Sequence, residues 1–269
     1  MPNYIDIACN FTHQAFDKIL PEVIEQSEKV GVRKFVLTCS SLRDINKINE
    51  IKALLKEKVF FMTGIHPHCA KEIHEFGLSK ITKIILDAKP DAIGETGLDF
   101  NRNFSSLEDQ LLSFQHHLSV AQETKLPLYL HQREAHDIFL GTLKESQAIY
   151  NNPFVVHCFT GNRKELEAYL NMGGFIGITG WICDYARNQE LAEAIRYIPL
   201  DRIMVETDCP YLLPKNLDPK PKRNLNYPYY LPHIVKEIGL IRNESEQLIA
   251  ENAYKNTLHF FNQASIDLN

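Results

Sequence analysis

Short apolar runs recur along the chain, and longer stretches with helical spacing separate them. Eight runs are rich in β-branched and aromatic residues, which is typical of buried strands. They are residues 4–10, 34–39, 59–66, 91–97, 127–132, 154–159, 174–179 and 202–208. Nearly continuous apolar strands that alternate with helices indicate β-α units around a parallel sheet covered on both faces. Eight such units predict an α/β fold, a single (β/α)8 TIM barrel.

Two of the intervening stretches carry clear helix signals. Residues 15–32 have spaced apolar positions and end at Gly31, and Pro21 fits the first turn of a helix that begins near Leu20. Ser106 and the acidic residues after it mark the start of another helix.

A proline-rich stretch follows the last predicted strand. Residues 210–233 contain six prolines, and we expect an ordered loop, because disorder would leave its aromatic residues exposed. No internal repeat and no boundary is visible, so we predict one domain over residues 1–269.

The composition is that of a water-soluble globular protein. Apolar residues make up 44% of the 269 residues, and no apolar run is long enough to cross a bilayer. The N-terminal MPNYIDIACNF lacks the segments of a secretory signal, so we expect a cytoplasmic protein without membrane association. Six scattered cysteines without CxxC spacing argue against a zinc ribbon and a disulfide framework. The net charge of −5 opposes a large basic surface for duplex DNA, but a small cleft that meets phosphate through a metal is compatible with it.

Two carboxylates interrupt the last apolar run. In MVETDCPYLL, residues 204–213, Glu206 and Asp208 stand where a strand is expected to stay apolar, and strand alternation places both on one face. Buried carboxylates are costly unless they are paired or bind a metal. The run therefore predicts a cation or a proton in front of them.

Polar residues stand at the ends of other predicted strands as well. The carboxyl ends of the strands in an eightfold barrel meet at one mouth, where catalytic residues gather. Glu95, His131, His157 and Asp208 hold corresponding places on four strands, so we predict a shared metal site. One such histidine alone is more often a hydrogen-bonded polar residue than a ligand. The mixed nitrogen and oxygen donors suit Mg²⁺, Mn²⁺ or Zn²⁺, and they leave the metal open.

Six motifs follow one another along nearly the whole chain: GIHPH, IGETGLDFNRN, the histidine of YLHQREAH, VVHCFTG, GFIGITGW and VETDCPYLLP. In this order they strongly resemble the TatD family of metal-dependent deoxyribonucleases. The resemblance implies a TIM barrel of the metallo-dependent hydrolase type, also called the amidohydrolase type. It further implies a Mg²⁺-dependent 3′ to 5′ exonuclease that acts on single-stranded DNA and RNA.

The resemblance also implies roles for individual residues. Glu95, His131, His157 and Asp208 match metal ligands, and Glu95 and Asp208 are the expected catalytic residues. Asp208 matches the aspartate that handles the attacking water, whereas Glu206 stays open between orienting a ligand and touching the metal.

The end of the first strand departs from the pattern of many relatives. They carry a His-x-His pair that ligates a metal, and this chain has Ala8, Cys9 and Asn10 in its place. The departure argues against a full two-metal arrangement.

These positions predict hydrolysis of a phosphodiester bond with Asp208 as the base for the water. Asn10, His66 and Arg133 are the candidate substrate-binding residues, and Arg133 is placed to hold a phosphate. His68 is explained equally well by a turn around Pro67. The lysines and tyrosines after the eighth strand suit a single-strand groove or pack the loop onto the barrel.

Two other functions remain compatible with the sequence. One is an amidohydrolase-like metalloenzyme that cleaves a small amide, ester or lactone, since fold and ligands do not fix the substrate. The other is a barrel that binds nucleic acid or a protein without catalysis. The expected partner is single-stranded DNA or RNA as substrate, and we expect a monomer.

Overall fold

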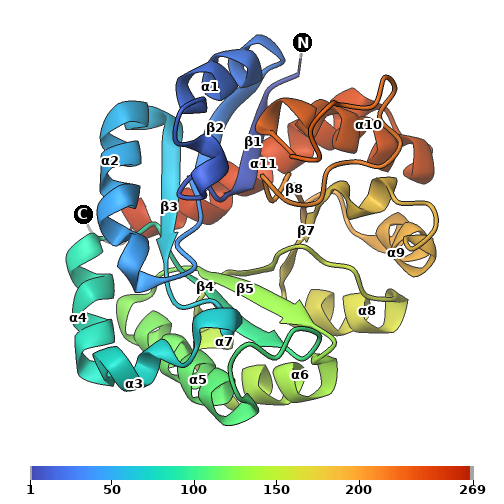
Figure 1. Ribbon diagram of the computed structural model, residues 1–269. Helices are drawn as coiled ribbons and strands as arrows, with labels where there is room; N and C mark the ends of the chain where they lie inside the picture. Colours follow the sequence, from blue (N-terminus) through green and yellow to red (C-terminus); the bar gives the residue numbers. More distant parts are fainter. Residues whose placement is uncertain (1, 267–269) are drawn as a thin grey trace.

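The eight expected strands are present and form one parallel sheet in the order β1 to β8 (Figure 1). The computed structural model describes residues 2–266, so residues 1 and 267–269, the outer limits of the predicted domain, lie outside it. The strands are β1 Tyr4–Cys9, β2 Val32–Leu37, β3 Val59–Thr63, β4 Ala92–Asp99, β5 Leu128–Arg133, β6 Phe154–Val156, β7 Phe175–Ile178 and β8 Ile203–Val205.

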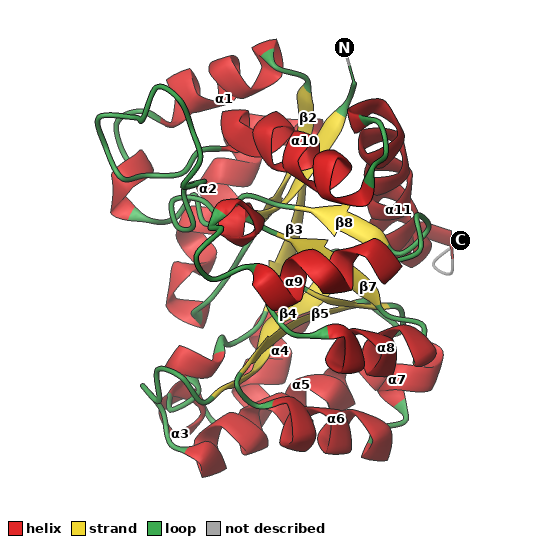
Figure 2. Cartoon of the chain, turned by 90° about the vertical axis from the view of Figure 1, so that its right-hand side faces the viewer, coloured by secondary structure: helices red, strands yellow, loops and turns green. Residues whose placement is uncertain are grey.

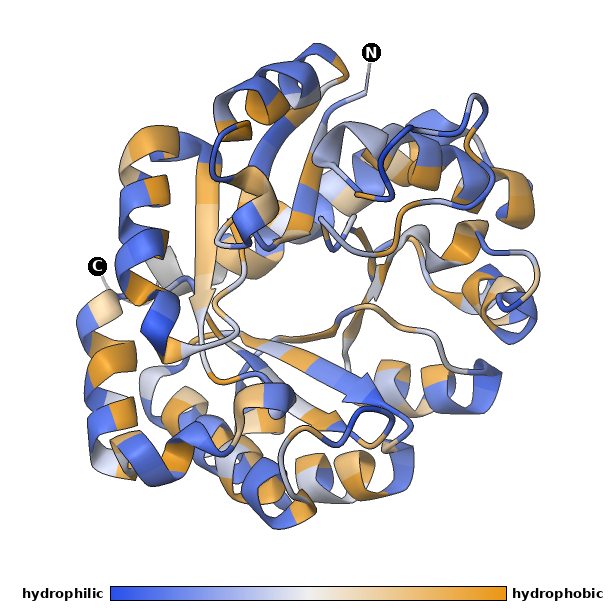
Figure 3. Ribbon diagram, viewed as in Figure 1, coloured by the Kyte–Doolittle hydropathy of each residue, from blue (hydrophilic) through white to orange (hydrophobic). Residues whose placement is uncertain are grey.

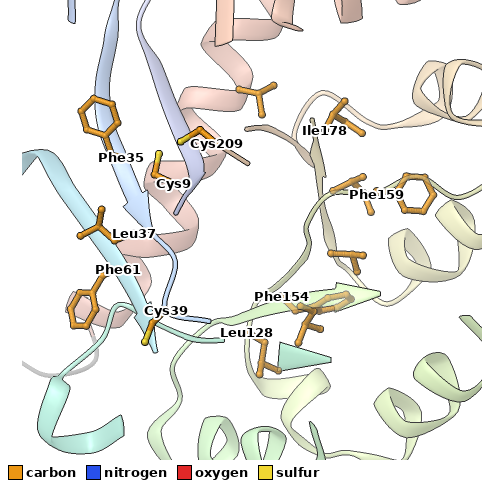
Figure 4. Close-up of a cluster of buried hydrophobic side chains, with 14 of the residues drawn as sticks. Cys9, Phe35, Leu37, Cys39, Phe61, Leu128, Phe154, Phe159, Ile178 and Cys209 are labelled. Atoms are coloured by element: carbon orange, nitrogen blue, oxygen red, sulfur yellow. The ribbon is translucent and has the colours of Figure 1, made fainter. Parts of the chain in front are cut away.

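An isolated bridge connects the two ends of the sheet. Cys9 at the end of β1 pairs with Cys209 in the segment after β8, and Figure 4 shows the two cysteines side by side. The sheet is therefore nearly closed, and the prediction of an eightfold TIM barrel is confirmed.

Helices surround the strands on all sides (Figures 1 and 2). Their bounds are α1 Leu20–Lys29, α2 Ile45–Leu55, α3 Glu72–Phe76, α4 Leu78–Ala88, α5 Leu107–Thr124, α6 His136–Glu145, α7 Ala148–Asn151, α8 Arg163–Asn171, α9 Gln189–Ala194, α10 Leu231–Arg242 and α11 Glu246–Ile266. Both helix signals are confirmed: Pro21 lies in the first turn of α1, and the hydroxyl of Ser106 accepts from Asp109 N at the start of α5. No helix between residues 2 and 266 is both long and apolar enough to cross a membrane.

Some boundaries differ from the sequence prediction. The ordered loop expected over residues 210–233 ends earlier, because a short helical turn begins at Pro228 and α10 begins at Leu231. Pro232 stands in the first turn of α10, where its missing N–H is not needed. Strand β4 is longer than expected and reaches Asp99, while β8 ends at Val205, three residues before the expected end.

The barrel contains an inner apolar cluster at one end. It draws side chains from all eight strands and from α11, with Phe60 and Phe261 stacked at a ring separation of 4.9 Å. The members are Ile5, Ile7, Val36, Phe60, Met62, Ala92, Tyr129, Val155, Phe175, Met204, Phe260 and Phe261. We call this set the floor cluster. A second cluster, partly shown in Figure 4, fills the space between strands and helices.

Candidate active site

The strands change from apolar to polar as they approach the mouth of the barrel. Figure 3 shows this plainly in β5, which turns hydrophilic toward its arrowhead. Tyr129 of the floor cluster and His131 lie two residues apart in β5, and strand alternation gives them the same face. Met204 of the floor cluster lies in β8, and Glu206 and Asp208 follow this strand toward the mouth. Polar residues at the mouth thus stand above apolar ones at the floor.

One carboxylate oxygen lies at the centre of the mouth. Glu95 Oε1 is 2.9 Å from His131 Nδ1, 2.7 Å from His157 Nε2 and 3.2 Å from His66 Nε2. His131 Nδ1 and His157 Nε2 are 3.2 Å apart. The structure therefore brings together three of the four predicted metal ligands, namely Glu95, His131 and His157. It adds His66, which we predicted from the sequence to bind substrate.

Two further carboxylates lie behind the imidazoles. Asp99 Oδ2 is 3.4 Å from His131 Nε2 and 2.8 Å from His68 Nε2. Glu206 Oε2 is 3.5 Å from His157 Nδ1 and accepts a 2.8 Å hydrogen bond from the Tyr129 hydroxyl. A carboxylate behind a metal-ligating histidine is a common arrangement, because it fixes the ring orientation.

Asp208, the fourth predicted ligand, is held from the side of β1. Asn10 Nδ2 donates to Asp208 Oδ1 at 2.9 Å and to the Cys209 carbonyl at 3.1 Å. Asn10 Oδ1 accepts a hydrogen bond from the Thr38 hydroxyl. The amide of Asn10 thus orients Asp208, a relation that its assignment as a substrate-binding residue did not include.

The electrostatic balance of the mouth is dominated by burial and by the central carboxylate. Burial acts to raise the pKa of Glu95, but His66, His157 and His131 outweigh it and hold that pKa well below its usual range. Burial acts to lower the pKa of His157, yet Glu95 and Glu206 raise it well above its usual range. Burial raises the pKa of Asp208 to about 7; His157 opposes this change, while Glu95 and Glu206 add to it. The mouth therefore concentrates negative charge that requires protons or a cation.

The donor set fits a divalent cation. Among the described residues, two groups have donor atoms that all lie within 4.8 Å of one another: His66, Glu95 and His131 at the mouth, and Asp6, Cys9 and Cys209 in the wall. In the second group Asp6 is already engaged, since it accepts from Thr207 N at 2.9 Å and from the Thr207 hydroxyl. At the mouth, His131 Nδ1 and His157 Nε2 both face Glu95 Oε1, so two imidazole nitrogens and a carboxylate oxygen converge on one place. The mouth is therefore the better cation site.

The remaining candidates from the sequence are Arg133 and the tyrosines after β8, and they differ in how far they are exposed. Arg133 ends β5 two residues after His131, is partly exposed, and has no side-chain partner in the described part of the chain. Tyr227 is buried, and its ring stacks on Tyr229 at 5.0 Å, so these tyrosines pack the loop onto the barrel. Tyr211 in contrast is 51% exposed.

Asp99 was missed by sequence reasoning. Its carboxylate is buried and accepts from the backbone N of Asn101 and Arg102, both at 2.9 Å. The available signal was its place four residues after Glu95 in the IGETGLDF motif, at the true end of β4.

Comparison with known proteins gives concordant results. The family model described as TatD related DNase matches residues 5–262. A relative from Erwinia tasmaniensis, named 3′-5′ ssDNA/RNA exonuclease TatD, is 39% identical over 96% of this chain and 99% of its own length.

Solved structures agree with the sequence match. A TatD family hydrolase from Entamoeba histolytica superposes with a TM-score of 0.87 at 26% identity, covering 96% of this chain and 98% of the other. The TatD homologue YjjV from Escherichia coli gives a TM-score of 0.84 at 25% identity, with the same coverage of both chains.

Proposed function

The chain belongs to the TatD-related DNase family and is a hydrolase of nucleic-acid ester bonds; from this premise we propose that it removes nucleotides stepwise from the 3′ end of single-stranded DNA and RNA with the help of Mg²⁺. The observation that carries the proposal is the mouth of the barrel. One buried carboxylate oxygen of Glu95 lies within 3.2 Å of three imidazole nitrogens, and Asp208 is held beside this group by Asn10.

Glu95, His131, His157 and Asp208 are the residues that would hold the cation. His66 lies close enough to Glu95 to contribute as a ligand or to face the substrate. The bound cation supplies Lewis-acid polarisation of the phosphate and of the attacking water. Mg²⁺ rests on the family resemblance, and because imidazoles also suit Mn²⁺ and Zn²⁺, those ions belong in the same assay.

Asp208 takes the proton of the attacking water in this proposal. A general base needs hydrogen-bond reach to its proton and a pKa near the working pH. The hydrogen bond from Asn10 Nδ2 serves the first requirement, because it fixes the orientation of the Asp208 carboxylate.

Arg133 binds a non-bridging oxygen of the scissile phosphate. Its guanidinium is partly exposed, has no partner among the described side chains, and stands on the same strand as His131. A free guanidinium at this place gives a paired, charge-assisted contact with phosphate.

The test uses single-stranded oligonucleotides labelled at the 3′ end or the 5′ end, incubated with Mg²⁺, Mn²⁺, Zn²⁺ or a chelator. Stepwise shortening from the 3′ end that requires metal is the expected result, and Asp208→Asn should slow it by about 10²- to 10⁴-fold. The matched control is Asp201→Asn, the same change on an exposed carboxylate just before β8, which should leave the rate unchanged. Metal-loaded, folded protein that shortens neither label contradicts the proposal.

A cytoplasmic location is part of the proposal. All six cysteines are free thiols, and four of them are buried. Reduced cysteines are typical of reducing compartments. The monomer expected from the sequence and the single domain stay predictions, which light scattering coupled to size exclusion and limited proteolysis would test.

A further inference from the structure

A hollow of about 300 Å³ opens between the segment that follows β7 and the segment that follows β8, and its lining includes Pro210 and Tyr211, shortly after Asp208 in the chain. The two walls approach closely at Gly180, where a Cβ atom would lie 2.2 Å from the Leu212 carbonyl oxygen. Glycine therefore permits this contact. The volume is at the lower end of the range for small-molecule pockets, which suits one compact group rather than a long segment.

Aromatic rings line the hollow. Trp181, Tyr211 and His13 all contribute to its surface, with the rings of His13 and Tyr211 5.8 Å apart and nearly perpendicular. Tyr211 is 51% exposed, and its hydroxyl has no hydrogen-bond partner in the described chain. Tyr211 therefore offers an exposed aromatic ring at a concave site, and its ring contact in the described chain is the edge-to-face one with His13.

The charges of the hollow favour an anionic strand. Lys215 lines it without an ion-pair partner among the described residues. The Arg187 guanidinium lies 4.2 Å from the centre of the Trp181 ring, and it pairs with Asp184, the one carboxylate among the described residues of the lining. One cation is thus left uncompensated.

A second hollow at the same end of the barrel has the opposite charge. Its volume is about 490 Å³, and none of the described residues that line it is a lysine or an arginine. Its carboxylates are Glu134, Asp137, Glu165 and Glu190. Because these groups repel phosphate, a strand that reaches the mouth is steered toward the first hollow.

The first hollow is directly coupled to the residues of the mouth. Tyr211 N donates to the Asp208 carbonyl at 2.9 Å, and His13 N donates to the Asn10 carbonyl at 3.0 Å. Asn10 in turn donates to the Asp208 carboxylate. The hollow is therefore lined by residues that follow Asp208 and Asn10 closely in the chain, at the mouth end of the barrel.

We propose that this hollow is a nucleobase subsite, in which one base next to the scissile phosphodiester stacks on Tyr211 and Trp181. The subsite rests on the nuclease function proposed above and deepens it. Base-to-aromatic stacking is tolerant of sequence, because every base has a π-face. Purines and pyrimidines are accordingly both accepted, and an abasic sugar phosphate is not.

Trp181 provides the test, because it is the only tryptophan in the chain. The fluorescence of the Asp208→Asn variant, which prevents turnover, is titrated with dAMP, dTMP and deoxyribose 5-phosphate. Both nucleotides should quench Trp181, and deoxyribose 5-phosphate should not. Tyr211→Ala should weaken nucleotide binding by about 5- to 150-fold, while Tyr211→Phe, which keeps the ring, should bind as before.

The matched control is Tyr150→Ala, which removes a 66% exposed tyrosine on α7 and should leave the titration unchanged. Equal quenching by deoxyribose 5-phosphate, no quenching by any ligand, or unchanged binding in Tyr211→Ala would overturn the subsite. If nucleotides quench Trp181 but the protein hydrolyses no oligonucleotide, the result supports the subsite and contradicts the nuclease proposal. If the protein hydrolyses oligonucleotides but quenching does not depend on the base, the result supports the nuclease proposal and contradicts the subsite.

Discussion

The two ends of the barrel are built from the same eight strands but carry opposite kinds of side chain. At one end the floor cluster is closed by Phe260 and Phe261 of α11. At the other end Glu95 faces three imidazoles. The floor gains free energy by burying apolar surface, whereas the mouth buries charges that are costly without partners. Stability and chemistry are therefore separated along the barrel axis.

A polar layer lies between these two ends. The Tyr129 ring belongs to the floor cluster, and its hydroxyl donates to Glu206 at 2.8 Å. Glu206 is fully buried, also accepts from Cys158 N, and lies 3.5 Å from His157 Nδ1. This layer connects the floor cluster to the imidazoles of the mouth.

The largest expected effect comes from the centre of the mouth. Glu95→Gln removes the charge that faces the imidazoles, so nuclease activity should fall by about 10³-fold or more, as expected when cation stabilisation of the transition state is lost. The far-UV circular dichroism should stay that of the wild type. Steady-state rates and a Mn²⁺ titration by calorimetry measure the change. Retained Mn²⁺ affinity together with full activity in Glu95→Gln would show that Glu95 is not part of the metal site.

A substitution at the floor should have the reverse profile. Phe260→Ala leaves a cavity among fully buried side chains, so the free energy of unfolding should fall by about 3–5 kcal/mol. At temperatures where the variant is folded, kcat/KM should stay within about twofold of the wild type. Urea denaturation measures the stability, with Phe104→Ala as control, since Phe104 is 58% exposed. A large activity loss in folded Phe260→Ala would contradict the separation of stability at the floor from chemistry at the mouth.

The intermediate layer should give an intermediate effect. Glu206→Gln leaves the floor intact but weakens the carboxylate behind His157, so metal affinity or activity should fall by about 10- to 100-fold. Calorimetric titration with Mn²⁺ separates a loss of metal affinity from a loss of fold. Glu190→Gln, a change on an exposed carboxylate in the acidic hollow, serves as the control and should leave Mn²⁺ affinity unchanged. Unchanged Mn²⁺ affinity in Glu206→Gln would show that Glu206 contributes to packing but not to metal binding.

The smallest effect is expected at the rim. Arg133→Lys keeps the positive charge but loses the paired donors of the guanidinium, so KM for an oligonucleotide should rise about fivefold with kcat nearly constant. The unfolding free energy should stay within about 0.5 kcal/mol of the wild type, as for most partly exposed positions. A change in kcat instead of KM would contradict the phosphate-binding assignment.

The sequence was sufficient to predict the barrel and the places of Glu95, His131, His157 and Asp208. Parallel strands bring their carboxyl ends together whatever the loops do, so strand-end position alone located these residues. Strand alternation also predicted Glu206 on the face of Asp208; the structure buries Glu206 in the polar layer, but β8 ends at Val205 and Asp208 has a positive φ of 55°, so alternation does not extend to these residues.

Other features depended on contacts that leave no local signal. The register of β4 and β5 shifts between Ile93 and Thr96, and the position of Asp99 behind His131 follows from that shifted register. Asn10 reaches Asp208 only because β1 and β8 meet where the sheet closes. Phe260 lies more than 50 residues after β8 in the sequence, and it reaches the floor because α11 packs across β1 and β8.

The central claim is that the mouth, and no other part of the barrel, binds the cation. Anomalous diffraction from crystals soaked in Mn²⁺ tests this directly, because it locates the ion without reference to activity. The expected result is a peak within coordination distance of Glu95, His131, His157 and Asp208, absent in Glu95→Gln crystals. A peak between Asp6, Cys9 and Cys209, or no peak in crystals whose mouth is open to solvent, would contradict the claim.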